Sequence, residues 1–138
     1  MKLIELFEDD FWKNLPRDMT LLEEISLDPN LLFEMANFRE KKTGFPGVVF
    51  VSSKMASRGP RVKYYLRADK QSASFSVSIA EEPQVVANSM KYYDVAFYSK
   101  YVIEFVRNNY EALLDFWENG HDYDTDELIE FINDIKPV

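Results

Sequence analysis

The segment RVKYYLRADKQSASFSVSI, residues 61–79, decides the fold class because apolar and polar side chains alternate along both of its halves. In the second half Phe75, Val77 and Ile79 alternate with serines, and in the first half apolar residues alternate with lysine, arginine and tyrosine. Strict alternation indicates two strands that each have one buried face and one wetter face. The residues RADKQS between them (67–72) are typical of a hairpin connection.

The neighbouring segments extend this pattern. VVFV (48–51) predicts a third strand, so the economical arrangement is a three-stranded antiparallel meander. Downstream, apolar residues at helical spacing predict one long helix over residues 95–117, which ends at an Asn-Gly stop signal (119–120). A last helix begins after Asp124, which is followed three residues later by Glu127.

Upstream of the sheet, three helices are predicted. Helical spacing favours a first helix over residues 4–15, and a capping box of Thr20 and Glu23 predicts a short second helix. Residues 30–40, NLLFEMANFRE, follow an Asp-Pro start signal and predict a third helix. We therefore expect a single α+β domain over residues 1–138: N-terminal helices, a three-stranded antiparallel meander, and a long helix and a short C-terminal helix packed on one sheet face.

Composition narrows the class of protein. The chain has 138 residues, of which 46% are hydrophobic and 15% aromatic, far from the composition of disordered proteins. No apolar run approaches the ~20 residues that cross a bilayer, and acidic residues interrupt the N-terminal segment, so we expect no membrane anchor and no signal peptide. The sequence has no cysteine, which excludes disulfides, thiolate catalysis and cysteine-ligated zinc, and a cytoplasmic location is expected.

Charge is distributed unevenly along the chain, whose net charge is -8. Residues 1–40 hold ten acids and four bases, and residues 111–138 hold nine acids and one base. Residues 54–70, in contrast, hold six bases and one acid, Asp69. The acidic ends therefore flank a basic centre, which argues against nucleic-acid binding by the whole surface but not against a local basic site.

We call this basic centre, residues 54–70, the basic stripe. The period of two places its strand residues on a shared face, where arginine forks could hold phosphate or carboxylate groups. Two other interpretations remain open: the cations line the solvent face or guard an edge of the sheet, or they pair with the chain's own acidic helices. The candidate residues for binding a protein or an anion are Arg58, Arg61, Lys63, Tyr65 and Arg67.

Two smaller groups could serve binding. The serines at positions 72, 74, 76 and 78 form a ladder that is expected on the wet side of the sheet. The aromatic residues of the segment 92–101 are expected to lie mostly in the core, whereas exposed tyrosines there would make a protein-binding patch.

No catalytic residue, metal site or cofactor is predicted. Asp122, Asp124 and Asp126 have the spacing of the start of a calcium loop, but Glu127 and Asn133 occupy its diagnostic glycine and glutamate positions. The only histidine, residue 121, follows a helix stop and is expected to be exposed, and no nucleophile elbow, P-loop or dinucleotide-binding motif occurs. An enzyme is the least favoured class.

Two short motifs carry a resemblance. PRVK at residues 60–63 and LLDFW at residues 113–117 resemble the Pro-His-x-His strand and Leu-Leu-x-x-Trp helix of a small prokaryotic family of unknown function, often encoded near toxin–antitoxin genes. The resemblance covers about residues 47–118 and implies the α+β order without an activity. Arg61 and Lys63 replace the two histidines, which puts in doubt any metal or proton-transfer role that the pattern implies.

The sequence therefore predicts a small soluble interaction or regulatory protein that binds a macromolecular partner without catalysis. Such a protein would be an acidic inhibitor or adaptor of bacterial or phage type, with a protein partner or a second copy of itself as its target. The alternative is binding of nucleic acid or a phosphate ligand through the basic stripe.

Overall fold

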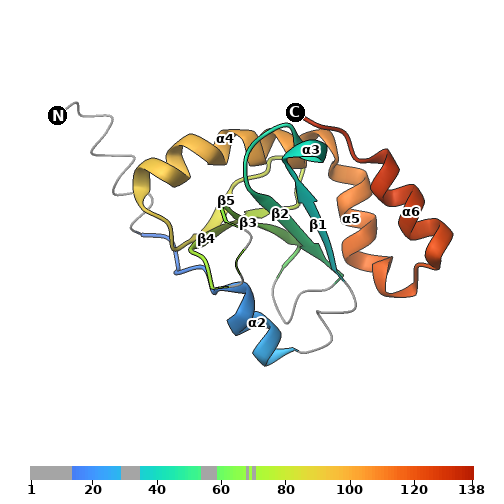
Figure 1. Ribbon diagram of the computed structural model, residues 1–138, viewed down its shortest axis with the longest axis horizontal. Coiled ribbons are helices and arrows are strands. Elements are labelled where there is room, and N and C mark those ends of the chain that lie inside the picture. Colours follow the sequence, from blue (N-terminus) through green and yellow to red (C-terminus); the bar gives the residue numbers. More distant parts are fainter. Residues whose placement is uncertain (1–13, 29–34, 54–58, 68, 70) are drawn as a thin grey trace.

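The structure, a computed structural model, describes residues 14–28, 35–53, 59–67, 69 and 71–138. Five strands form one antiparallel sheet in the order β1-β2-β3-β4-β5, so each strand pairs with its neighbours in the chain (Figure 1). The strands are β1 (Met35–Arg39), β2 (Val48–Ser52), β3 (Arg61–Tyr65), β4 (Ser74–Ser78) and β5 (Val85–Asn88). The α+β class and the antiparallel meander are confirmed, but the meander has two strands more than predicted.

The first additional strand, β1, lies within the segment 30–40 for which a helix is predicted. Its Ala36 and Phe38 are buried whereas Asn37 and Arg39 are exposed, which is the alternation of a strand. The prediction of a helix is wrong here because β1 pairs along its whole length with β2, and this tertiary pairing outweighs the local helical spacing. The Asp-Pro start signal extends outside the described residues. The second additional strand, β5, is short and was missed.

Five described α-helices accompany the sheet. They are α2 (Leu21–Leu27), α3 (Glu40–Thr43), α4 (Tyr92–Asn108), α5 (Tyr110–Asn119) and α6 (Thr125–Asp134), and a 3-10 turn η2 (Gly120–Asp122) joins the last two. Both predicted capping boxes are present, at Thr20 for α2 and at Asp124 for α6. Most of the predicted first helix, residues 4–13, lies outside the described residues. None of the described helices is long and apolar enough to span a membrane.

The predicted long helix is broken at Asn109 into α4 and α5. The Asn109 side chain is buried and donates to the carbonyl oxygens of Phe105 and Lys136, both at 2.9 Å. Its own oxygen accepts from the Lys136 backbone nitrogen at 2.8 Å. The helix is interrupted at Asn109, where the short amide side chain hydrogen-bonds to the backbone of Lys136 in the C-terminal segment. Short amide side chains can compete in this way with the regular hydrogen bonds of a helix.

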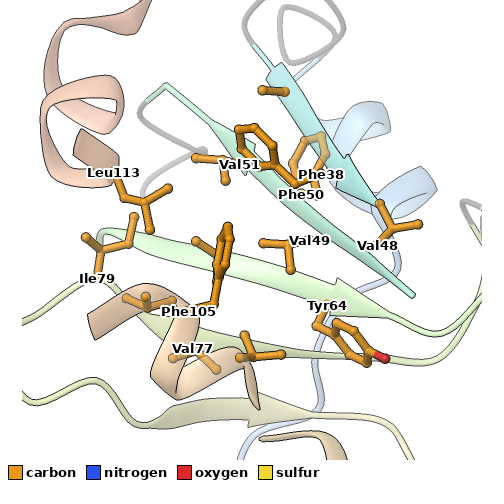
Figure 2. Packing of buried hydrophobic residues seen from close by; sticks show 14 of the residues in the cluster. Phe38, Val48, Val49, Phe50, Val51, Tyr64, Val77, Ile79, Phe105 and Leu113 are labelled. Carbon is orange, nitrogen blue, oxygen red and sulfur yellow. The ribbon is translucent and has the colours of Figure 1, made fainter. Parts of the chain in front are cut away.

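Helices cover both faces of the sheet, whereas the sequence predicted one covered face. In Figure 1, α4 lies on one side of the sheet and α2 on the other, with α5 and α6 beyond the β1 end. In Figure 2, Phe105 of α4 and Leu113 of α5 point toward the sheet, where Val49 and Val77 are among the buried residues. Side chains that alternate with these apolar residues along a strand point to the opposite face of the sheet, where the segment that contains α2 lies.

The start of α2 carries an ion pair whose effect depends on pH. Both terminal nitrogens of Arg17 donate to the Glu23 carboxylate at 3.0 Å, and the Thr20 backbone nitrogen donates to it as well. These bonds lower the pKa of Glu23 from 4.5 to about 2. The bond from Arg17 has the largest effect on this pKa, and the bond from the Thr20 backbone has the second largest. A lowered folded-state pKa stabilises the fold above the unfolded value and loses this effect as the pH falls.

We therefore expect Glu23→Gln to flatten the dependence of stability on pH between the ordinary pKa of 4.5 and the folded value of about 2. The loss occurs as the pH falls because the unfolded chain takes up the proton first. Thermal unfolding of wild type and variant across this range measures it, and Arg17→Gln should flatten the same interval. Parallel profiles for wild type and Glu23→Gln would contradict this assignment.

Candidate functional site

The centre of the basic stripe is buried. Lys63 of β3 has no exposed surface, and its Nζ lies 2.9 Å from Oδ2 of Asp18 and 3.3 Å from Oε2 of Glu24. The same nitrogen donates to the Met19 carbonyl oxygen at 2.6 Å. Of the interpretations above, pairing with the chain's own acidic residues is what the structure shows for Lys63.

Asp18 joins this ion pair to the serine ladder. Its carboxylate accepts from the hydroxyls of Ser74 at 2.6 Å and Ser76 at 2.8 Å, and both serines are buried. The expectation that this side of the sheet is wet is therefore wrong for these two serines, because residues 18–24 cover it. A buried carboxylate with several donors is the arrangement that makes a charge tolerable inside a protein. We call Asp18, Glu24, Lys63, Ser74 and Ser76 the buried polar cluster.

The other residues of the predicted binding stripe do not form one exposed surface. Tyr65 is buried and donates to Oδ1 of Asn37 at 3.3 Å, Arg61 is half-buried, and Arg67, just beyond β3, is exposed. Arg58 lies outside the described residues. The period of two was correct for the shared face of β3, but that face packs inward, so of the described stripe candidates Arg67 alone is exposed.

The structure brings Ser53, His121 and Asp122 together, although no catalytic serine is predicted. The Ser53 hydroxyl lies 3.2 Å from Nδ1 of His121, whose Nε2 lies 3.3 Å from Oδ2 of Asp122. Ser53 is buried, accepts from the His121 backbone nitrogen and donates to the Trp117 carbonyl oxygen at 3.3 Å. The Ser53 contacts join the end of β2 to the end of α5 and to η2.

Two acidic residues at the start of α6, Asp124 and Glu127, have a structural role. Asp124 accepts from the Glu127 backbone nitrogen at 2.8 Å, and Glu127 accepts from the Asp124 backbone nitrogen at 3.2 Å, which completes the capping box. Among the residues that the structure describes, no group of three or more histidine, cysteine or acidic side chains is placed to hold a metal ion.

The first half of α4 presents aromatic side chains to solvent. Tyr93 is 58% exposed and Phe97 is 51% exposed, one turn apart on the helix. The expectation of a core position is wrong for both, because α4 turns a different face toward the core. The side chains of α4 that are buried in the core cluster are Val95, Val102, Phe105 and Val106.

Two lysines lie against these exposed rings. Nζ of Lys100 is 5.1 Å from the centroid of the Phe97 ring, and Nζ of Lys91 is 5.9 Å from that of Tyr93. These distances are within the range of cation–π attraction. We define Lys91, Tyr93, Phe97 and Lys100 as the α4 patch, a surface that combines ring faces with positive charge.

A cavity of about 500 Å³ adjoins the α4 patch. Leu66 and Arg67 line it from the β3–β4 connection, and Lys91 and Tyr93 line it from the start of α4. Ser72, Ser89, Asp69 and Asp94 contribute further polar groups. Arg67, the exposed candidate of the basic stripe, thus lies beside the α4 patch.

Helix α6 presents a second exposed surface of opposite charge. Ile129 is 51% exposed and Ile132 is 38% exposed, and the acidic Asp126 and Glu130 are exposed beside them. The opposite side of the helix buries Phe131. We define Asp126, Ile129, Glu130 and Ile132 as the α6 patch. The sequence analysis does not predict this patch, although the excess of acids in residues 111–138 indicates an acidic surface.

Comparisons of the chain with protein-family models, with curated proteins and with solved structures found no match. The resemblance to the family encoded near toxin–antitoxin genes therefore stays a prediction.

Proposed function

We propose that this protein is an interaction module that binds a protein partner through the α4 patch and does not transform a substrate. The observation that carries the proposal is the pair Tyr93 and Phe97, two aromatic side chains more than half exposed on adjacent turns of one helix. Aromatic side chains are enriched at the energetic centres of protein interfaces, because they bury a large area at a small entropic cost.

The chemistry of the patch favours a partner that is acidic and partly apolar. Lys91 and Lys100 stand beside the rings, and Arg67 borders them across the adjoining cavity. Cations at the rim of an interface steer and select a negatively charged partner, while the ring faces accept apolar side chains. By occupying such a surface, a bacterial or phage protein of this size would act as an inhibitor or adaptor.

The test compares the proteins retained, from a lysate that also contains free copies of this chain, by immobilised wild type, by Tyr93→Ala/Phe97→Ala and by Leu22→Ala/Leu27→Ala. The last variant is the matched control, because Leu22 and Leu27 are exposed apolar residues of α2. We expect the partner to be retained by wild type and control but reduced at least about tenfold with the α4 variant, since hot-spot truncation costs ~1.4 kcal/mol or more. Equal retention by all three would contradict the proposal.

Binding of a nucleic acid or another phosphate ligand is the second candidate. The observation that favours it is the cavity in which Arg67 and Lys91 lie with Tyr93, because cations contact phosphates and aromatic rings stack on bases. Asp69 and Asp94 line the same cavity and oppose a polyanion. Titration with single- and double-stranded oligonucleotides at low and moderate salt, on wild type and Arg67→Ala, separates this candidate from the first.

A further inference from the structure

The α4 patch and the α6 patch both contain apolar side chains, and the charges beside these side chains are opposite in sign. The α4 patch offers the rings of Tyr93 and Phe97 beside two lysines. The α6 patch offers the aliphatic side chains of Ile129 and Ile132 beside two acidic residues. Each patch therefore has the chemistry that the other would bind: apolar groups for the centre of a contact and opposite charges for its rim.

One copy of the chain cannot bring these two surfaces together. In Figure 1 the start of α4 lies on the left of the horizontal longest axis, and α6 lies on the right. The face of α6 that packs on the body of the protein holds Phe131, which stacks on Phe116 of α5 at 4.4 Å between ring centroids. The α6 patch is consequently directed away from the fold that carries it.

We propose that the partner of the α4 patch is a second copy of this chain, whose α6 patch docks onto it. The inference rests on the proposed function and adds the identity of the occupant. Charge complementarity selects this occupant: residues 111–138, which include α6, carry nine acids and one base, whereas the α4 patch carries Lys91 and Lys100, and Arg67 balances one of the two acids, Asp69 and Asp94, that line the adjoining cavity.

The contact joins different surfaces of the two copies, which allows two kinds of assembly. In a two-fold dimer the α4 patch of each copy meets the α6 patch of the other, and both contacts form at once. In a head-to-tail arrangement one α4 patch and one α6 patch stay free at the ends of the pair, and further copies add until a ring closes or an open filament forms. In both cases the fraction of chains in the assembly should grow with protein concentration and fall as salt screens the charged rim.

Sedimentation velocity of the full chain over a wide range of concentration measures this association. Lys91→Glu/Lys100→Glu places acids in both patches, and Asp126→Lys/Glu130→Lys places bases in both. Each double variant is expected to weaken self-association at least about tenfold, because like charges then face each other across the contact. Ile129→Ala/Ile132→Ala removes the apolar centre without a change of charge and should weaken it too, and thermal unfolding confirms that each variant is folded.

The decisive sample is an equimolar mixture of the two charge-reversed variants. Each variant then meets a surface of opposite charge only on the other variant, so the mixture should regain association while each variant alone stays at least about tenfold weaker than the wild type. A chain that carries all four substitutions has both charges exchanged and should associate with itself again. Leu22→Ala/Leu27→Ala is the matched control and should associate as the wild type does.

Two results would overturn the inference: a wild type that stays monomeric at every concentration, or an assembly that both charge reversals leave intact. The sedimentation and retention experiments together distinguish a failure of this inference from a failure of the proposed function. If the protein is monomeric but still retains a partner that Tyr93→Ala/Phe97→Ala loses, the α4 patch binds another protein and only the identity of the occupant is wrong. If the oligonucleotide titration alone shows binding, both proposals fail.

Discussion

Replacement of Lys63 by methionine is expected to lower the free energy of unfolding by about 3–5 kcal/mol, because it leaves two buried carboxylates without their cation. Lys63 has no exposed surface, and its ammonium group contacts both Asp18 and Glu24. Methionine fills most of the lysine volume, so the loss measures charge rather than a cavity. Urea unfolding at neutral pH, followed by circular dichroism, provides the measurement.

The matched control is Lys41→Met, which removes an exposed lysine of α3. An exposed lysine contributes little to stability, so this variant should stay within about 0.5 kcal/mol of wild type. A loss below about 1 kcal/mol for Lys63→Met would show that Asp18 and Glu24 do not depend on this cation.

Replacement of Phe131 by alanine is expected to cost about 3–5 kcal/mol in the free energy of unfolding, the usual range for a buried phenylalanine. Phe131 is the buried side chain of α6. It stacks on Phe116 with an interplanar angle of 4°, and its ring edge meets Phe38 at 5.9 Å between centroids. Because it holds α6 against the sheet and α5, its loss should also abolish self-association through the α6 patch.

Ile129→Ala provides the control on the same helix. Its side chain is exposed, so this variant should retain nearly all of the stability while it weakens self-association. Chemical denaturation and sedimentation velocity on both variants separate the two effects. A Phe131→Ala protein that is as stable as Ile129→Ala would mean that α6 is not anchored by its aromatic contact.

Local signals account for the elements that the sequence predicted correctly. Strands β2, β3 and β4 show short runs or alternation that no helix would produce, and the capping boxes at Thr20 and Asp124 use residues three apart. The helix break at Asn109 and strand β1 depend instead on partners far along the chain. Asn109 bonds to Lys136, and β1 needs β2 to satisfy its backbone groups.

The candidate site shows the same division. Alternation placed Arg61, Lys63 and Tyr65 on one face of a strand, as observed, but periodicity does not say what lies against that face. Asp18 is 45 residues from Lys63 in the chain, and no local pattern links them. The exposure of Tyr93 and Phe97 likewise depends on which side of α4 packs on the sheet, and helical periodicity did not identify that side.

This chain's sequence, taken alone, determined an α+β domain with an antiparallel meander, two capped helices and a strong separation of charge. The tertiary structure decided that Lys63 of the central strand turns inward to meet Asp18 and Glu24, and that the rings of Tyr93 and Phe97 on α4 turn outward. The physical reason is that periodicity depends on neighbours along one element, whereas burial depends on the layer that packs on it.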